Sequence, residues 1–184
     1  MMKNNNIIAI GGVGGSGTRV LSDILSQCAY FTGNDLNESS DNLLFTLLFK
    51  RQNILTLSKN EFDETVDLFV KIMSTKNSLT EKEKGIILDL ASEDRTLHNK
   101  EWLSKRLDYV DKREEVSEWG WKEPNTHMVI EKLFEKLENL KFVYVYRNAF
   151  DMAHSTNQNQ LKLWGSIFFN DNNLEVNPRN SLKY

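Results

Sequence analysis

A glycine-rich stretch near the N-terminus limits what this 184-residue chain can fold into more than any other feature. Residues 7–12, IIAIGG, form a short apolar run ended by glycines, which is typical of a buried parallel strand. Residues 18–28 follow with apolar side chains at helical spacing. Glycines in the loop between them let backbone N–H groups converge, and the helix N-terminus adds the positive end of its dipole. We therefore expect this loop to bind an anion.

The end of the loop differs from that of a nucleotide-hydrolysing loop. Gly12 and Gly17 have the spacing of the first and last glycines of such a loop. There, the last glycine precedes a lysine that meets the β- and γ-phosphates and a hydroxyl that holds magnesium. Here Thr18 stands at the lysine position and Arg19 at the hydroxyl position. Both changes argue against a nucleoside triphosphatase and favour an anion with less charge, such as a sulfate ester.

Two later segments are also predicted to be strands, and each is followed by a helix start. Residues 116–122, VSEWGWK, alternate in polarity, and residues 141–147, KFVYVYR, are β-branched and aromatic. Residues 42–110 show helical patterns throughout, with capping-box signatures at Ser58 and Thr80. This order predicts one α/β domain over the whole chain, a three-layer P-loop fold with a central parallel sheet and a helical insertion.

A continuous helix is predicted after the last strand. Asn148 with Asp151 three residues on resembles a capping box that opens AFDMAHSTNQNQLKLW. The apolar residues of this segment lie on one helical face, which places Trp164 in the core, and we expect the same of Trp119 and Trp121.

Composition narrows the partners and the compartment. The formal net charge is −3, which argues against nucleic acid and large polyanionic partners. A single cysteine, Cys28, cannot form an intramolecular disulfide, and no apolar run is long enough for a signal peptide or a membrane span. We expect a cytoplasmic protein. The ending NPRNSLKY, without a helix cap or a polar tail, suggests a shortened chain.

An arginine and a serine eight residues apart point to a second anion contact. Arg147 ends the last predicted strand, where a parallel sheet faces its ligand crevice, and Ser155 lies about two turns into the next helix. Arginine makes bidentate contacts to phosphate, and serine adds a hydroxyl donor. Read singly, Arg147 fits an ion pair with Asp151, and Ser155 fits a solvent-facing position. Together, and behind the glycine loop, they favour an anion site.

This combination resembles the P-loop sulfotransferases. GGSGTR is similar to the first motif of that family and RNAFDMAHS to its second, while WGWKEPNTH resembles a segment between them in some bacterial members. The resemblance implies the donor 3′-phosphoadenosine 5′-phosphosulfate (PAPS), no metal, and a 3′-phosphate held by Arg147 and Ser155. It also implies that the 5′-phosphosulfate end lies on the first loop, at Gly14, Gly15, Ser16, Gly17, Thr18 and Arg19.

The chain departs from the family at two points. Many members have a lysine or arginine where this chain has Gly15, and that cation stabilises the departing phosphate. The family's late glycine- and lysine-containing loop over the adenine is also not visible here. Lys122, at the end of a predicted strand, is the first candidate for the missing charge and Arg19 the second. The alternative is that Lys122 pairs with a surface carboxylate, as most lysines do.

A general base for the acceptor is predicted among four residues. The segment TGNDLNESSDNL offers Asp35, Glu38 and Asp41, and His127 lies near Lys122. We favour Asp41, although it fits equally well as the N-cap of the following helix.

Three functions remain open from the sequence. The leading one is transfer of a sulfuryl group from PAPS to a hydroxyl or amine of a small-molecule, carbohydrate or lipid acceptor. A P-loop kinase or NTPase with a shifted lysine predicts a strand-end aspartate for magnesium, which the strands ending at Lys122 and Arg147 lack. A nucleotide-binding module without transfer activity is the third.

Overall fold

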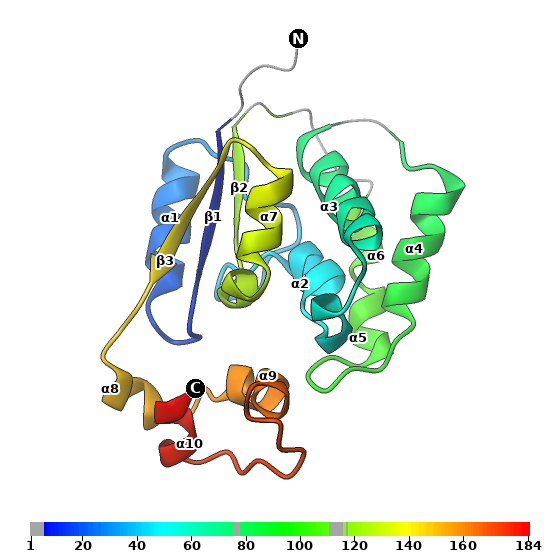
Figure 1. Cartoon of the computed structure of the whole chain (residues 1–184). Coiled ribbons are helices and arrows are strands. Elements are labelled where there is room, and N and C mark those ends of the chain that lie inside the picture. The colour runs from blue at the N-terminus through cyan, green and yellow to red at the C-terminus, as the bar shows by residue number, and fades with distance from the viewer. Residues whose placement is uncertain (1–5, 76–77, 111–115, 117) are drawn as a thin grey trace.

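A parallel three-stranded sheet lies at the centre of the molecule (Figure 1). The computed structural model describes residues 6–75, 78–110, 116 and 118–184. Within these residues the strands β1 (Ile7–Gly12), β2 (Trp119–Lys122) and β3 (Leu140–Val145) have the order β2-β1-β3, and both pairings are parallel. The predicted α/β class with a central parallel sheet is confirmed.

The strand that was predicted first, β1, has the expected bounds, but among the described residues the other two are shorter than predicted. Residue 117, in the predicted range 116–122, lies outside the described residues. β2 begins at Trp119, opposite Ile7, the first residue of β1. β3 ends at Val145, opposite Gly12, the last residue of β1, so Arg147 lies two residues beyond the sheet. Because β1 is the central strand, its length decides how far each neighbour finds hydrogen-bond partners.

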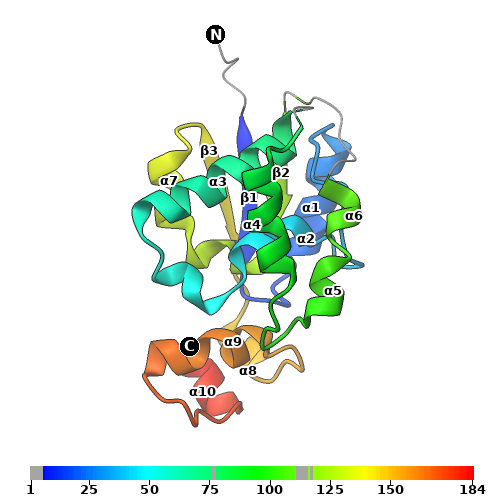
Figure 2. The ribbon, with the colours of Figure 1, turned by 90° about the vertical axis from the view of Figure 1, so that its right-hand side faces the viewer.

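Helices cover the two faces of the sheet (Figures 1 and 2). α1 (Thr18–Gln27) packs on one face, where a Cβ on Gly120 would lie 3.1 Å from Leu25 Cδ2. α2 (Leu43–Phe49), α3 (Lys59–Ser74) and α7 (Ile130–Lys136) cover the other. On that face Phe69 meets Trp119 and Trp121 edge-on, with centroids 5.9 and 5.2 Å apart. Trp164 is also fully buried, so the expected core positions of all three tryptophans are confirmed.

The described part of residues 42–110 is helical, as predicted, but is divided into several helices; residues 76 and 77 lie outside the described residues. After α2 come the 3-10 helix η1 (Gln52–Leu55), α3, α4 (Glu81–Ala91), α5 (Lys100–Ser104) and α6 (Leu107–Val110). Ser58 and Thr80 both close reciprocal capping boxes, at the starts of α3 and α4, so those two predictions are confirmed. The described helices include none with the length and apolar composition needed to cross a membrane.

The predicted continuous helix after β3 is wrong. The chain forms α8 (Ala149–Ala153), an irregular turn, α9 (Asn159–Phe169) and α10 (Pro178–Lys183). In the turn, Ser155 Oγ accepts the N–H of Asn157, and Gln158 Nε2 donates to the carbonyls of Met152, Ala153 and Ser155. These side chains take the backbone groups that a continuing helix would use. The three helices lie beyond the carboxyl ends of the strands, at the same end of the sheet as the glycine loop (Figure 1).

A separate short helix lies between β2 and α7. Pro124–Met128 forms the 3-10 helix η2, whose N-cap is Glu123, and only then does α7 start. The Glu123 side chain is fully buried; its Oε2 accepts the Asn125 N–H at 2.6 Å, and its Oε1 forms an ion pair with Lys50 Nζ at 3.2 Å. Asn125 Oδ1 in turn accepts Trp164 Nε1–H at 2.8 Å. This network ties the end of β2 to α9.

Candidate functional site

The glycine loop turns sharply from β1 into α1. Gly15 and Gly17 have φ of 94° and 105°, values that residues with a side chain rarely adopt. A Cβ on Gly12 would lie 2.2 Å from the carbonyl oxygen of Val145 on β3, so this position admits only glycine. The Ser16 N–H closes the turn on the carbonyl of Val13 at 3.0 Å. The loop conformation therefore depends on its glycines.

The N-terminus of α1 is not satisfied by a side chain of its own. Gly17 is the N-cap and makes no side-chain cap, and the first turn carries no acidic residue. The first N–H groups of a helix have no intrahelical partner and carry a partial positive charge. Within the described residues, the buried Ser16 Oγ also has no hydrogen-bond partner. The loop and helix start thus present donors suited to an external anion.

One side chain from α9 forms two hydrogen bonds with the loop. Gln160, which is 6% exposed, accepts the Gly14 N–H through Oε1 at 2.7 Å and donates from Nε2 to the Gly12 carbonyl at 3.0 Å. No sequence motif singled out Gln160, which lay within the continuous helix predicted for AFDMAHSTNQNQLKLW. The Gly14 N–H therefore already has a partner inside the chain.

Ser155 lies beside the loop, although not within a helix. A Cβ on Gly15 would be 3.7 Å from Ser155 Oγ and 3.6 Å from Met152 Cε. The serine follows the end of α8 because of the turn described above. A side chain at position 15 would therefore point toward Ser155.

Arg147 lies at the other end of α8 and is half-exposed. Its Nε is 3.5 Å from Asp151 Oδ2, the ion pair that the alternative interpretation expected. Both side chains are more than half exposed, and ion pairs of this kind contribute about 0–1 kcal/mol. So weak a pair leaves the guanidinium available to a bound anion. Arg147 and Ser155 flank α8, a helix about 8 Å long from its five residues.

Lys122 and Asp41, the two candidates for catalysis, contact each other. Lys122 is 3% exposed, and its Nζ donates to the carboxylate of Asp41 and, at 3.0 Å, to the carbonyl of Ser39. The other Asp41 oxygen accepts Asn37 Nδ2–H at 2.9 Å. Lys122 therefore does pair with a carboxylate, as the alternative interpretation expected. The lysine of this pair is buried, and its partner is the other candidate for catalysis.

Lys122 lies on the face of the sheet that α1 covers. It pairs with Ile10, two residues before the glycine loop, and shares its face with Gly120, which approaches α1. Arg19, the second candidate for the missing charge, is exposed and its Nη1 lies 3.5 Å from the Glu38 carbonyl. The segment that carries Glu38 and Asp41 therefore runs beside α1.

Asp41 is not the N-cap of α2. That role belongs to Asn42, whose Oδ1 accepts the Phe45 N–H at 2.8 Å. The N-cap alternative for Asp41 is therefore wrong, because the helix begins one residue later than that reading required.

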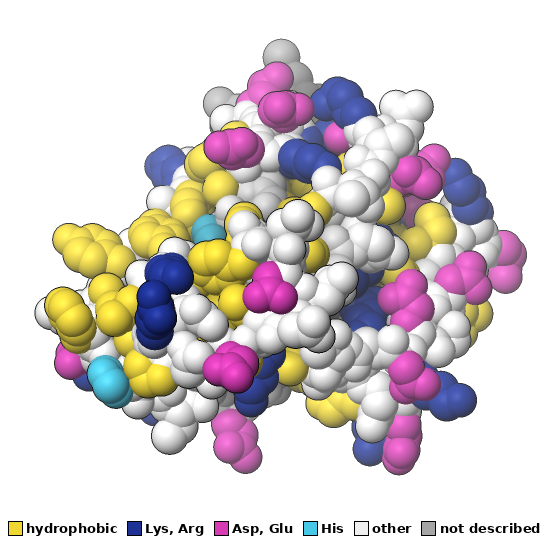
Figure 3. Space-filling model, turned by 60° about the horizontal axis from the view of Figure 1, so that its bottom comes forward, with side chains coloured by type: hydrophobic (Ala, Val, Ile, Leu, Met, Phe, Trp, Pro, Cys, Tyr) yellow, Lys and Arg dark blue, Asp and Glu magenta, His cyan; other side chains and the backbone are white. Residues whose placement is uncertain are grey.

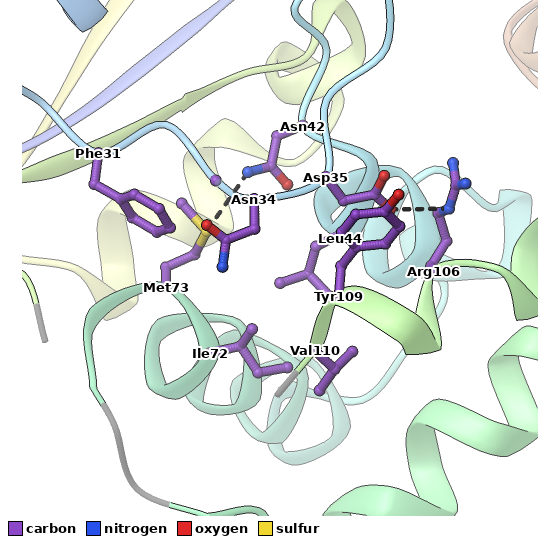
Figure 4. A pocket seen from close by; sticks show the side chains of 11 residues that line it. Phe31, Asn34, Asp35, Asn42, Leu44, Ile72, Met73, Arg106, Tyr109 and Val110 are labelled. Atoms are coloured by element: carbon purple, nitrogen blue, oxygen red, sulfur yellow. Dashed lines mark hydrogen bonds and ion pairs between the residues drawn. The ribbon is translucent and has the colours of Figure 1, made fainter. Parts of the chain in front are cut away.

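The other candidate bases are in different surroundings. Asp35 lies 2.9 Å from Arg106 Nε without the alignment of a hydrogen bond, beside a cavity of about 20 Å³ that fits one water (Figure 4). Burial raises the pKa of Asp35, and Arg106 opposes this. Burial lowers the pKa of His127, whose Nδ1 is 2.8 Å from the Pro124 carbonyl oxygen. Of the four candidate bases, Asp41 is the one whose described contacts include Lys122.

The face beyond the strand ends carries mixed charge. Lysine and arginine side chains are interspersed with acidic ones, and apolar side chains gather at one side (Figure 3). A continuous basic stripe is not seen on this face, which fits the weak negative net charge. The arrangement does not favour a long polyanionic ligand.

Comparison with known proteins gives one family. The sulfotransferase domain family matches residues 6–175. The match includes the glycine loop, the segment from Arg147 to Ser155 and the helical middle between them. The chain therefore belongs to the sulfotransferase domain family and is a transferase. Neither the curated proteins nor the solved structures include a match.

Proposed function

We propose that this member of the sulfotransferase family transfers a sulfuryl group from PAPS to a hydroxyl or amine of a small acceptor. The observation that carries the proposal is the uncapped start of α1 behind a glycine loop, with Thr18 and Arg19 where a triphosphatase has its lysine and metal-binding hydroxyl. A transferring sulfuryl group carries less negative charge than a phosphoryl group. Donors from backbone and hydroxyl groups are therefore suited to it.

The donor is proposed to lie along the loop and over α8. The backbone N–H groups of Gly15, Gly17, Thr18 and Arg19 and the Ser16 hydroxyl bind the 5′-phosphosulfate end, while Gly14 contributes shape because Gln160 occupies its N–H. Arg147 and Ser155 bind the 3′-phosphate from the two ends of α8. No metal is needed for this arrangement.

In the proposed transfer, the acceptor oxygen or nitrogen attacks sulfur in line with the bridging S–O bond. The new bond to sulfur forms as the S–O bond breaks, and adenosine 3′,5′-bisphosphate leaves with the electron pair. Lys122 has three N–H donors and gives two to Asp41 and Ser39, so one remains for the leaving oxygen. Asp41 receives the acceptor's proton as Lys122 shifts toward the leaving group.

The acceptor is proposed to be a small polar molecule. A cavity of about 300 Å³ lies between the helical middle and α9, within the size range of ligand pockets. Its lining mixes cations with anions, among them Lys50, Arg51, Glu93 and Asp94.

The cytoplasm is the proposed compartment, since the single Cys28 is exposed and free.

A non-catalytic nucleotide-binding module is the second candidate. The observation in its favour is Gly15, because the cation that many family members carry there is missing. It shares the donor site with the first candidate and differs only in turnover. Assay with PAPS across sugar, phenol and amine acceptors separates the two.

Calorimetry with adenosine 3′,5′-bisphosphate, AMP, and ATP with magnesium tests the donor assignment. We expect the bisphosphate to bind about tenfold or more tightly than AMP, since Arg147 and Ser155 add charge-assisted hydrogen bonds to the 3′-phosphate. Arg147→Ala removes that preference. The matched control is Lys141→Ala, which removes an exposed cation from the opposite end of β3. Tight binding of ATP and none of the bisphosphate would refute the proposal.

A further inference from the structure

Gln160 makes a contact with the glycine loop that neither catalysis nor the family motifs assign. Its amide satisfies two backbone groups of the loop, the Gly12 carbonyl and the Gly14 N–H. A primary amide suits this pair because it offers one acceptor and one donor side by side. The bonded residues are 146 and 148 positions apart in the sequence, so the two hydrogen bonds connect the loop to a helix from the far end of the chain.

The helix that carries Gln160 is itself anchored. Four residues later, on the same side of α9, Trp164 donates its indole N–H to Asn125 Oδ1 at 2.8 Å and is fully buried. Asn125 is held by the buried Glu123 at the end of β2. Gln160 therefore extends to the loop from a helix whose position is fixed, and its side chain has little freedom to move away from the loop.

Loop shape is what this contact controls. Glycines leave the loop with many accessible conformations, and the donors converge on an anion in few of them. Fixing Gly12 and Gly14 on either side of Val13 restricts the turn that leads into Gly15 and Gly17. The cost of ordering the loop is then met during folding and not when the ligand binds.

We propose that Gln160 is a positioning residue that holds the glycine loop in its anion-binding shape, an inference that rests on the proposed donor site. It contacts no reacting atom itself. Its removal weakens binding of the donor nucleotide more than it slows transfer from the saturated enzyme. The KM for the donor rises while kcat changes little.

The test uses binding of adenosine 3′,5′-bisphosphate to the full chain by calorimetry. Gln160→Met fills the same space but makes neither hydrogen bond to the buried backbone of Gly12 and Gly14, and is expected to weaken binding about tenfold. The control is Gln52→Met, which removes the 2.6 Å bond from Gln52 Nε2 to the Leu163 carbonyl of the same helix but does not reach the loop. Melting temperatures measured alongside separate lost stability from lost affinity.

Gln160→Glu gives a readout that a purely structural role would not give. When protonated, glutamic acid reproduces both bonds, with its carbonyl accepting from Gly14 and its hydroxyl donating to Gly12. When ionised, it faces the Gly12 carbonyl with an acceptor and adds negative charge beside the anion. Its affinity relative to the wild type should therefore recover as the pH falls from about 8 to about 5. Gln160→Met, which does not titrate, should show no recovery.

Each outcome decides between the inference and the function on which it rests. If the wild-type chain does not bind the bisphosphate, the proposed donor site fails and the inference with it. If the wild type binds and Gln160→Met binds equally well or more tightly, the donor site stands and the positioning role is wrong. An equal loss in Gln52→Met, or no pH recovery in a folded Gln160→Glu, likewise overturns it.

Discussion

The pair formed by Lys122 and Asp41 permits a test that separates stability from chemistry. Lys122→Met removes the charge and keeps most of the aliphatic volume of a side chain that is 3% exposed. Asp41 then retains Asn37 as a side-chain partner but loses its cation. Asp41→Asn, made alone and together with Lys122→Met, completes a double-mutant cycle.

The structure sets the expected magnitude. Breaking a buried ion pair costs about 3–5 kcal/mol, and Asp41 is 17% exposed, so we expect Lys122→Met to lose about 2–4 kcal/mol of unfolding free energy. For a chain of this size that lowers the melting temperature by about 4–16 °C. The double variant leaves no unpaired charge and should return to within about 1 kcal/mol of the wild type.

Activity should not follow stability. If Lys122 stabilises the departing phosphate, both variants that lack it should lose about 10²–10³ in kcat, as for other groups that stabilise developing charge. Thermal unfolding by circular dichroism and PAPS turnover, measured on the same four proteins, provide the two readouts. A double variant that regains both stability and turnover would show that Lys122 is only structural. Full activity in Lys122→Met would refute its role directly.

Two further predictions concern pH and the loop. Burial lowers the pKa of His98 from 6.5 to about 4, so the unfolded state binds a proton at a pH where the folded state does not. The free energy of unfolding should therefore fall as the pH drops from 6.5 toward 4, by about 1–2 kcal/mol at pH 5. Urea unfolding at both pH values checks this, and His98→Phe, which keeps a ring on Trp102, should remove most of that loss. Gly15→Lys should cost about 1–2 kcal/mol of stability because φ is 94° there, and Gly15→Ala should cost the same. If Lys122 supplies the charge, as we propose, Gly15→Lys should change kcat by no more than about threefold, and a hundredfold gain would contradict that assignment.

Features that depend on neighbouring residues could be predicted from the sequence. The apolar run before the glycines, the helix after them and the capping boxes at Ser58 and Thr80 all appear in the structure. Each follows from contacts between residues a few positions apart, where backbone geometry and hydrogen-bonding needs are set locally. The parallel sheet followed because strands joined by helical crossovers pair in parallel.

Contacts between distant parts of the chain were decided by the tertiary structure. The sequence pattern of residues 149–164 is helical, yet Gln158 takes the carbonyls of Met152 and Ala153 at the end of α8, and Ser155 then lies beside the loop. Asp41 and Lys122 were proposed separately, and their pairing across 81 positions depends on how the chain returns along α1. The hydrogen bond between Gln160 and Gly14 corresponds to no pattern among neighbouring residues in the sequence. Side-chain hydrogen bonds of this range form only after packing has placed their elements, so periodicity and spacing do not encode them.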